Sequence, residues 1–195
     1  MTRSGIRLFA VLPCVLAAAP ALAHSGDLAG GFAGGLAHPV FGPDHVAAMV
    51  AVGLWGAFLG MPAMVLLPVV FPLVMALGGA LGILGVPLPG VEIGIAASAV
   101  VLGLGVALAA RPPLWIAAVL VGLFAIFHGH AHGSELPSGA DAVAFSAGFV
   151  IATGLLHLTG IAFGLLAHWP AGRIAVRAAG AAIAFVGVAF LTGIA

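Results

Sequence analysis

Residues 63–86 read AMVLLPVVFPLVMALGGALGILGV and contain no charged side chain. About 20 consecutive apolar residues in a helix cross the hydrocarbon core of a bilayer, so this stretch predicts a transmembrane helix. The rest of the chain has the same character, because 64% of its 195 residues are hydrophobic and only 5% are charged. A soluble domain carries about 25% charged residues. We therefore expect an all-α, polytopic membrane protein.

Six apolar stretches follow the first 23 residues, and each predicts one membrane-spanning helix. They are residues 43–60, 63–86, 91–110, 113–131, 141–167 and 174–194. Short polar, proline-containing or glycine-containing segments divide them, such as the turn at 87–90 and the Arg111-Pro112-Pro113 run. These connections are too short for an extramembrane domain. Residues 24–195 are therefore predicted to form one transmembrane domain of six helices.

The first 23 residues have the three-part pattern of a secretory signal peptide. Arg3 and Arg7 form a positively charged start, residues 8–19 are a short apolar core, and Ala21-Leu22-Ala23 is an A-x-A cleavage site. The polar sequence HSGD follows directly. We expect cleavage after Ala23, and the alternative is an uncleaved first helix.

The arginines predict the orientation, because positively charged residues favour the cytoplasmic side of a membrane. With the mature N-terminus outside, Arg111, Arg173 and Arg177 all fall in cytoplasmic connections. Asp27, Glu135 and Asp141 then fall outside. The leader and the arginines thus predict the same topology, that of a bacterial inner-membrane protein with a periplasmic mature N-terminus.

The first polar cluster is His38-Pro39-Val40-Phe41-Gly42-Pro43-Asp44-His45, with Met49 one turn beyond it. Pro43 suits the first turn of a helix, where its missing N–H would be unpaired anyway. We expect residues 38–42 to be non-helical, with free backbone carbonyls. Imidazole, carboxylate and thioether groups together suit a first-row transition metal, which favours a metal site. The alternative is a capped helix start with an interfacial histidine.

The second polar cluster is His128-Gly129-His130-Ala131-His132-Gly133-Ser134-Glu135. At about 100° per helical residue, His128, His132 and Glu135 share one face, and His130 points roughly opposite. Two imidazoles and a carboxylate on one face favour a metal site. The alternative is an exposed histidine-rich loop. Both clusters fall on the outer side in the predicted topology.

Three other ionisable residues are weaker candidates for metal contact. Glu92 opens the third predicted span, where an acid also interacts well with the helix dipole. His157 lies deep in the fifth span and is interpreted as a transfer site, or else as a buried hydrogen-bonding residue. After cleavage, His24 would offer a metal both its imidazole and its free N-terminal amine. His168, beside Trp169, is interpreted as an interfacial residue.

Composition excludes two other classes of function. Five arginines and no lysine, spread over the whole chain, make no basic patch for nucleic acid. Cys14, the one cysteine, lies within the signal peptide, which excludes a disulfide framework and a cysteine-based metal site.

The stretch HPVFGPDHVAAMVAVGLWG resembles the signature HPxxGxDHxxxMxxVG of the HupE/UreJ family of membrane proteins. The later EIGIAAS and HGHAHGSELP stretches are similar to other motifs of that family, so the resemblance covers essentially the whole chain. The family is associated with nickel or cobalt uptake linked to hydrogenase or urease maturation. The resemblance implies metal-handling roles for His38, Asp44, His45, Met49, His128, His130, His132 and Glu135.

These observations predict a permease that takes up Ni²⁺ or Co²⁺ as a transported ion and holds no permanent cofactor. Hydrogenase or urease maturation proteins are its expected partners. We expect uptake to weaken below about pH 6, because protonated histidines do not bind metal. Two alternatives remain open, a metal-sensing or accessory subunit without transport and an intramembrane metalloenzyme. We expect no enzyme, because H-E-x-x-H and recognisable nucleophile motifs are absent from the sequence.

We predict that the leader is cleaved between Ala23 and His24, because the A-x-A site follows a short apolar core. N-terminal sequencing of the membrane-inserted protein should therefore begin at His24. An intact Met1 start would contradict this prediction and would also remove the His24 amine as a metal ligand.

Overall fold

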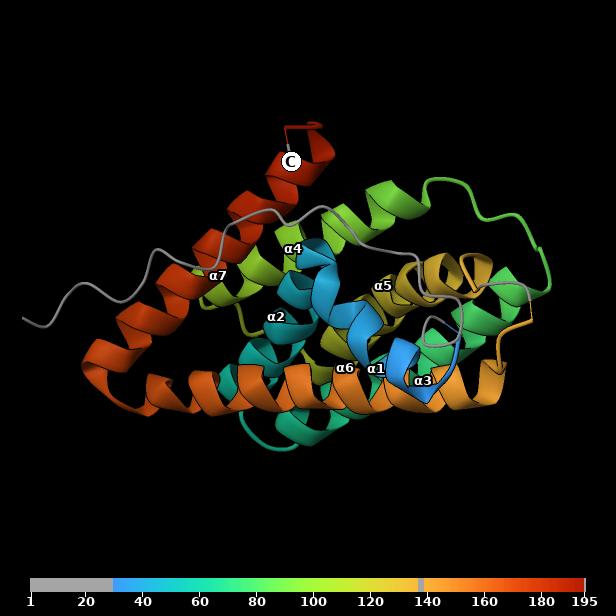
Figure 1. Ribbon diagram of the computed structural model, residues 1–195. Helices are drawn as coiled ribbons and strands as arrows, with labels where there is room; N and C mark the ends of the chain where they lie inside the picture. Colours follow the sequence, from blue (N-terminus) through green and yellow to red (C-terminus); the bar gives the residue numbers. More distant parts are fainter. Residues whose placement is uncertain (1–29, 137–138, 195) are drawn as a thin grey trace, which may run out of the picture.

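The computed structural model describes residues 30–136 and 139–194, and this part of the chain is all-helical. The predicted signal peptide and His24 lie outside the described residues. Seven α-helices follow one another, with a short 3-10 helix between the last two (Figure 1). They are α1 (Phe32–Phe41), α2 (Pro43–Leu59), α3 (Ala63–Ile83), α4 (Val91–Ala107), α5 (Leu114–Ser134), α6 (Ala142–Gly164), η1 (Leu165–His168) and α7 (Pro170–Leu191).

Four helices are long and apolar enough to cross a membrane, namely α3, α5, α6 with η1, and α7. The pair α1 and α2 would make a fifth span, although the two helices are bent by 87° where they meet. Helix α4 has 17 residues, which is about 26 Å and slightly less than a hydrocarbon core of about 30 Å. Each of the six predicted stretches contains one of the helices α2 to α7, in the same order. That all six helices cross the membrane stays a prediction.

Helix α4 ends early for a local reason. Ala109, two residues beyond it, has φ 55°, a left-handed conformation that ends a helix. The Arg111-Pro112-Pro113 run follows, and prolines cannot continue the hydrogen-bond ladder.

The expectation that residues 38–42 are non-helical is wrong for all but Gly42. Helix α1 continues through His38 and Pro39 to Phe41, and α2 begins at Pro43, as expected for a proline in a first helical turn. The helix survives Pro39 because α1 packs closely on α6: Gly35 lies so near the Phe145 backbone that a Cβ would clash with it. Tertiary packing thus overrides the local effect of the proline.

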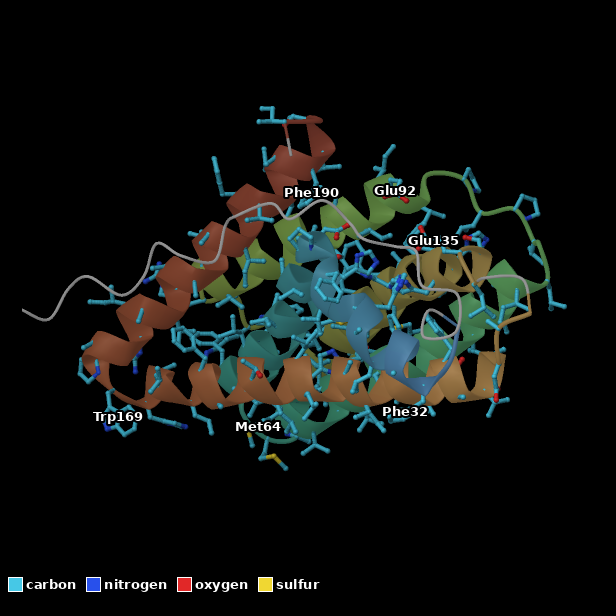
Figure 2. The ribbon with its side chains drawn as sticks, in the orientation of Figure 1. Phe32, Met64, Glu92, Glu135, Trp169 and Phe190 are labelled. Carbon is cyan, nitrogen blue, oxygen red and sulfur yellow. The ribbon has the colours of Figure 1, made fainter. Side chains whose placement is uncertain are left out.

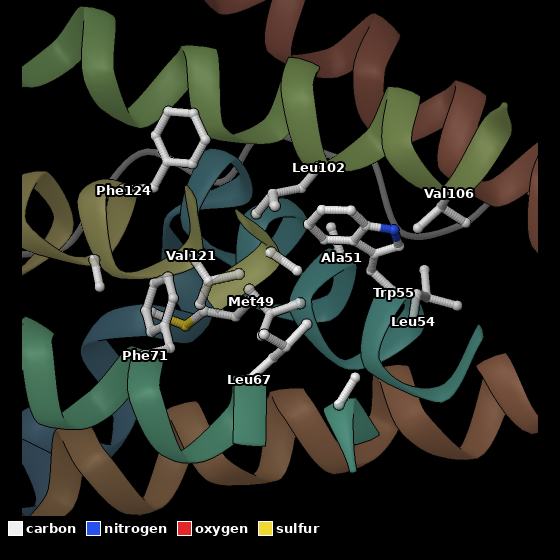
Figure 3. Packing of buried hydrophobic residues seen from close by; sticks show 14 of the residues in the cluster. Met49, Ala51, Leu54, Trp55, Leu67, Phe71, Leu102, Val106, Val121 and Phe124 are labelled. Atoms are coloured by element: carbon white, nitrogen blue, oxygen red, sulfur yellow. The ribbon is translucent and has the colours of Figure 1, made fainter. Parts of the chain in front are cut away.

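The helices pack mainly in three pairs, α3 with α5, α2 with α6 and α4 with α7, and α1 lies against α6 (Figure 1). Their shared core contains Met49, Trp55, Phe71 and Leu102, all buried (Figure 3). Trp55 closes one end of this core, where its Nε1–H donates to the Ala110 carbonyl over 3.1 Å.

The arginines and the two polar clusters lie at opposite ends of the bundle. Arg111 stacks over the Phe58 ring at 4.9 Å, and Arg177 Nε donates to the Ala107 carbonyl over 2.7 Å. Trp169 lies at this end, far from Glu92 and Glu135 (Figure 2). The separation agrees with the predicted topology, in which the two ends face different sides of the membrane.

We predict that Gly103→Ala destabilises the bundle. A Cβ at Gly103 would lie 2.6 Å from Ala184 N and 2.7 Å from the Gly180 carbonyl, so α4 and α7 would have to separate. Overpacking of this kind costs about 1–3 kcal/mol, and thermal unfolding of the purified protein in detergent should show the loss.

Gly154→Ala is the matched control, because a Cβ there meets nothing within 4 Å. We expect this variant to unfold at the parent temperature or slightly above it, since alanine favours a helix over glycine. Equal stability of the two variants would contradict the close α4–α7 contact.

Candidate metal centre

Most of the predicted metal-ligating side chains meet at one end of the bundle. His38 lies in the last turn of α1, and the first turn of α2 carries Asp44 and His45. The last two turns of α5 carry His128 and His132, and Glu135 is the C-cap of this helix. We call the six side chains the histidine cluster; they are His38, Asp44, His45, His128, His132 and Glu135.

The imidazole rings of the cluster form a continuous file. The ring centroid of His132 lies 4.8 Å from that of His38 and 4.5 Å from that of His45. The His45 centroid in turn lies 4.8 Å from that of His128. At the start of the file, His38 Nε2 lies 3.6 Å from Glu135 Oε2. One ligand atom each from His38, His132 and Glu135 all lie within 4.8 Å of one another, so small adjustments would let one ion contact all three.

Asp44 orients the imidazole of His45. Its Oδ1 lies 2.9 Å from His45 Nδ1, and an ionised carboxylate can only accept a hydrogen bond. His45 therefore carries a hydrogen on Nδ1, and in the neutral ring Nε2 is left with a lone pair. That atom is buried and has no hydrogen-bond partner. Carboxylates orient metal-ligating histidines in this way.

Ser98 of α4 orients the imidazole of His128. Its hydroxyl donates its one hydrogen to the Ile95 carbonyl over 2.6 Å, so it must accept from His128 Nε2, which lies 2.9 Å away. His128 Nδ1 is then the atom with the free lone pair, and it too is buried without a partner. The sequence interpretation missed Ser98, although it lies in the EIGIAAS stretch that resembles a family motif.

Four buried nitrogens of the cluster lack a hydrogen-bond partner among the residues that the structure describes: His45 Nε2, His128 Nδ1 and both ring nitrogens of His132. More than 90% of buried polar groups in proteins are paired, and each unpaired one costs about 1–3 kcal/mol. A cation bound among the rings would pair with the free lone pairs. Imidazole and carboxylate ligands in this combination fit a divalent first-row transition metal.

Exposure is highest at the start of the file of rings and lowest at its end. His38 and Glu135 expose 38% and 56% of their side-chain surface, and His45 exposes 12%. His132 is buried, and His128 has no exposed surface at all. An ion could therefore meet partly hydrated ligands first and buried ligands later.

The cluster also contains negative charge. The His38 imidazole beside Glu135 holds the pKa of this carboxyl below its usual value, so the carboxyl is ionised at neutral pH. Asp44 supplies the second carboxylate. Two carboxylates would balance the charge of one divalent cation.

Four predicted ligands lie outside the cluster, and one of them, His157, is buried deeper in α6. Met49 is completely buried in the apolar core, in the same group as Phe71 and Leu67 (Figure 3). Glu92 lies at the start of α4, where its side chain is exposed. His130 points away from His128 and His132, as the helix periodicity predicts, and its Nε2 donates to the Val86 carbonyl over 2.7 Å. This bond ties α5 to the segment between α3 and α4.

The fold and the cluster define a polytopic membrane protein with a candidate transition-metal site at one end of its helices. Residues 12–190 match the family described as HupE / UreJ protein. The chain is 47% identical over 178 residues to "Protein HupE" of Rhizobium leguminosarum bv. viciae, an alignment that covers 90% of this chain and 93% of that protein. No solved structure matches the chain. The chain belongs to the HupE/UreJ family.

We predict that Ser98→Ala weakens metal binding by about tenfold or more, the usual effect of losing a partner that orients a ligating histidine. Without the hydroxyl, His128 Nε2 loses its acceptor and the ring is no longer held with Nδ1 toward the cluster. Equilibrium binding of radiolabelled nickel to the purified protein would measure the change.

Ser134→Ala is the matched control for this variant. The Ser134 hydroxyl also donates to a carbonyl three residues earlier, that of Ala131, over 2.8 Å, but no hydrogen bond joins it to a histidine. If the two variants bind nickel equally, Ser98 has no orienting role.

Proposed function

We propose that this protein takes up a divalent transition-metal ion, nickel or cobalt, across the bacterial inner membrane. Membership of the HupE/UreJ family supports this proposal, since the family is associated with nickel or cobalt uptake for hydrogenase or urease maturation. The proteins that mature those enzymes are the proposed recipients of the ion. The ion is the transported substrate and not a resident cofactor.

One observation carries the proposal: neighbouring imidazoles, with ring centroids 4.5–4.8 Å apart, lie inside an apolar bundle with nitrogens that lack a partner among the described residues. A histidine-rich loop that only concentrates metal at a surface would keep its rings hydrated. Here His128 and His132 are buried, and their orphan nitrogens point to a missing cationic partner. The third ring of the file, that of His45, is oriented by Asp44.

The geometry supports a sequence of ligand exchanges. His38 and Glu135, which are partly exposed, would capture the hydrated ion. His132, in contact with the His38 ring and the His45 ring, would replace some of its water ligands. His45 and His128 would then hold the largely dehydrated ion. Each step exchanges a water for an imidazole, so the ion never lacks ligands as it leaves the solvent.

The orientation follows from the same arrangement. The cluster lies at the end of the bundle away from the arginines, and arginines favour the cytoplasmic side. We propose that the cluster faces the periplasm, together with the mature N-terminus produced by the predicted cleavage. Uptake then moves the ion from the cluster toward the arginine-bearing end.

We predict that His45→Ala and His132→Ala insert into the membrane at parent levels but lose uptake at limiting nickel. Each variant removes a ligand without disturbing the apolar packing between helices, so the half-saturating nickel concentration should rise by about tenfold or more. Radiolabelled nickel uptake, in cells that lack other importers, would be measured against nickel concentration and normalised to protein in the membrane. Cobalt would be measured in parallel.

His168→Ala is the control, because this histidine is exposed in η1 at the other end of the bundle. We expect it to transport like the parent. Parent-like uptake by both cluster variants at limiting nickel would overturn the proposed site. If vesicles that contain only this protein accumulate no nickel or cobalt, the accessory or sensing alternative replaces transport.

A further inference from the structure

A second group of polar atoms without a partner among the described residues lies deeper in the bundle, beside the aromatic ring that also neighbours His128. Phe71 of α3 is completely buried, and its ring centroid lies 5.5 Å from that of His128 and 5.3 Å from that of His157. The file of rings that begins at His38 therefore continues through Phe71 to His157. Helix α6 carries His157 about 22 Å from its first residue, well inside the predicted span.

His157 and Thr153 lie one turn apart on α6 and share a face. Both ring nitrogens of His157 and the Thr153 hydroxyl are buried without a hydrogen-bond partner. A helical threonine usually donates to the carbonyl four residues earlier, as Thr159 does to Leu155 and Thr192 does to Val188, both over 2.9 Å. The Thr153 hydroxyl makes no such bond and is free to contact a ligand.

Helix α3 offers an oxygen to the same place. The Pro68 main chain lies close to the His157 ring. Pro68 has no N–H, so the facing group is its carbonyl. One turn later Pro72 also lacks the N–H that would normally pair with this carbonyl. His157 thus lies close to a carbonyl of α3 and one helical turn from the Thr153 hydroxyl.

We propose that His157, Thr153 and the Pro68 carbonyl form an inner transit site for the transported metal ion, separated from the histidine cluster by the Phe71 ring. This inference rests on the proposed function. His157 has almost no exposed surface, so an ion reaches it only when the Phe71 side chain turns aside. Phe71 then acts as an apolar barrier between the histidine cluster and the inner site.

The charge of the inner site fits transit and not storage. The acidic residues of the described chain are Asp44, Glu92, Glu135 and Asp141, and all of them lie at helix ends. The inner site therefore has only neutral ligands, whereas the cluster has two carboxylates. A pathway needs stations that an ion can enter and also leave, and the absence of a carboxylate at this site makes departure easy.

The first test removes the nitrogens of His157 and keeps a ring of similar shape. His157→Phe should insert at the parent level and bind nickel at the histidine cluster with unchanged affinity. Its maximal uptake rate should fall by about tenfold or more, with an unchanged half-saturating concentration. A His157 that belonged to the cluster would instead raise the half-saturating concentration, as the cluster variants do, and that result would overturn a separate inner site.

The second test asks whether an ion reaches this point, and its probe is cadmium. The mature chain is predicted to have no cysteine, since Cys14 lies in the leader. A thiolate at position 153 or 157 would bind the soft cadmium ion tightly and block the pathway. For Thr153→Cys and His157→Cys we expect external cadmium to inhibit nickel uptake at concentrations about tenfold or more below those that inhibit the parent.

Thr159→Cys is the matched control, because Thr159 lies on the same helix with an exposed side chain whose hydroxyl is already paired. It should keep the cadmium sensitivity of the parent. Thr153→Cys changes the side-chain volume little. This variant therefore tests whether an ion reaches the inner site even if His157→Cys fails to fold. Parent-like cadmium sensitivity in a transporting Thr153→Cys variant would overturn the inner site alone. Absence of uptake by the parent chain would instead overturn the proposed function on which the inner site rests.

Discussion

Inside a bilayer no water is available to pair with a polar atom, so every such atom must find its partner within the protein. The helices satisfy this constraint for most of the backbone, and Trp55 satisfies it for its indole N–H through the Ala110 carbonyl. The buried imidazoles do not satisfy it. Among the described residues, the nitrogens without a hydrogen-bond partner belong to histidines of α2, α5 and α6. The free-energy cost of these unpaired nitrogens is explained if a transported cation becomes their partner.

Moving a divalent cation into a low-dielectric interior is expensive unless ligands and counter-charges replace its water. The ligands and the counter-charges are distributed unevenly along the file of rings. At the partly exposed start, Glu135 and Asp44 bring negative charge and the imidazoles bring lone pairs. Around His157 the ligands are neutral. The ion would thus be held most firmly where water is nearest and least firmly in the centre, an arrangement that opposes trapping.

The apolar stretches, the helical spacing of polar residues, and the positions of proline and glycine were sufficient to predict much of this architecture. The predicted stretch at 63–86 became α3, and the faces assigned to His128, His132 and Glu135 are those that α5 presents. His130 was predicted to point away from these residues, and it contacts Val86 instead. These features depend on spacing along one helix, which a sequence displays directly.

The features that the sequence did not reveal depend on contacts between distant segments. Ser98 is 30 residues from His128, and only the packing of α4 on α5 brings the hydroxyl to the ring. Met49 shares a helical face with His45, yet the neighbouring helices enclose it in the apolar core. The helix through Pro39 likewise depends on the contact between Gly35 and α6. Local rules could not predict which of several tolerable local states the tertiary packing would select.

The HGHAHG stretch shows how one short motif specifies two surfaces of α5. His128 and His132 are four residues apart and face the cluster, whereas Gly129 and Gly133 are also four apart and face α3. At both glycines the backbone of α3, at Met75 and Gly79, lies where a Cβ would be. Larger residues there would push α3 away, and α3 carries Phe71 one turn before Met75. The glycines thus hold the aromatic ring near His128, so the spacing that brings the candidate metal ligands together also positions the proposed barrier.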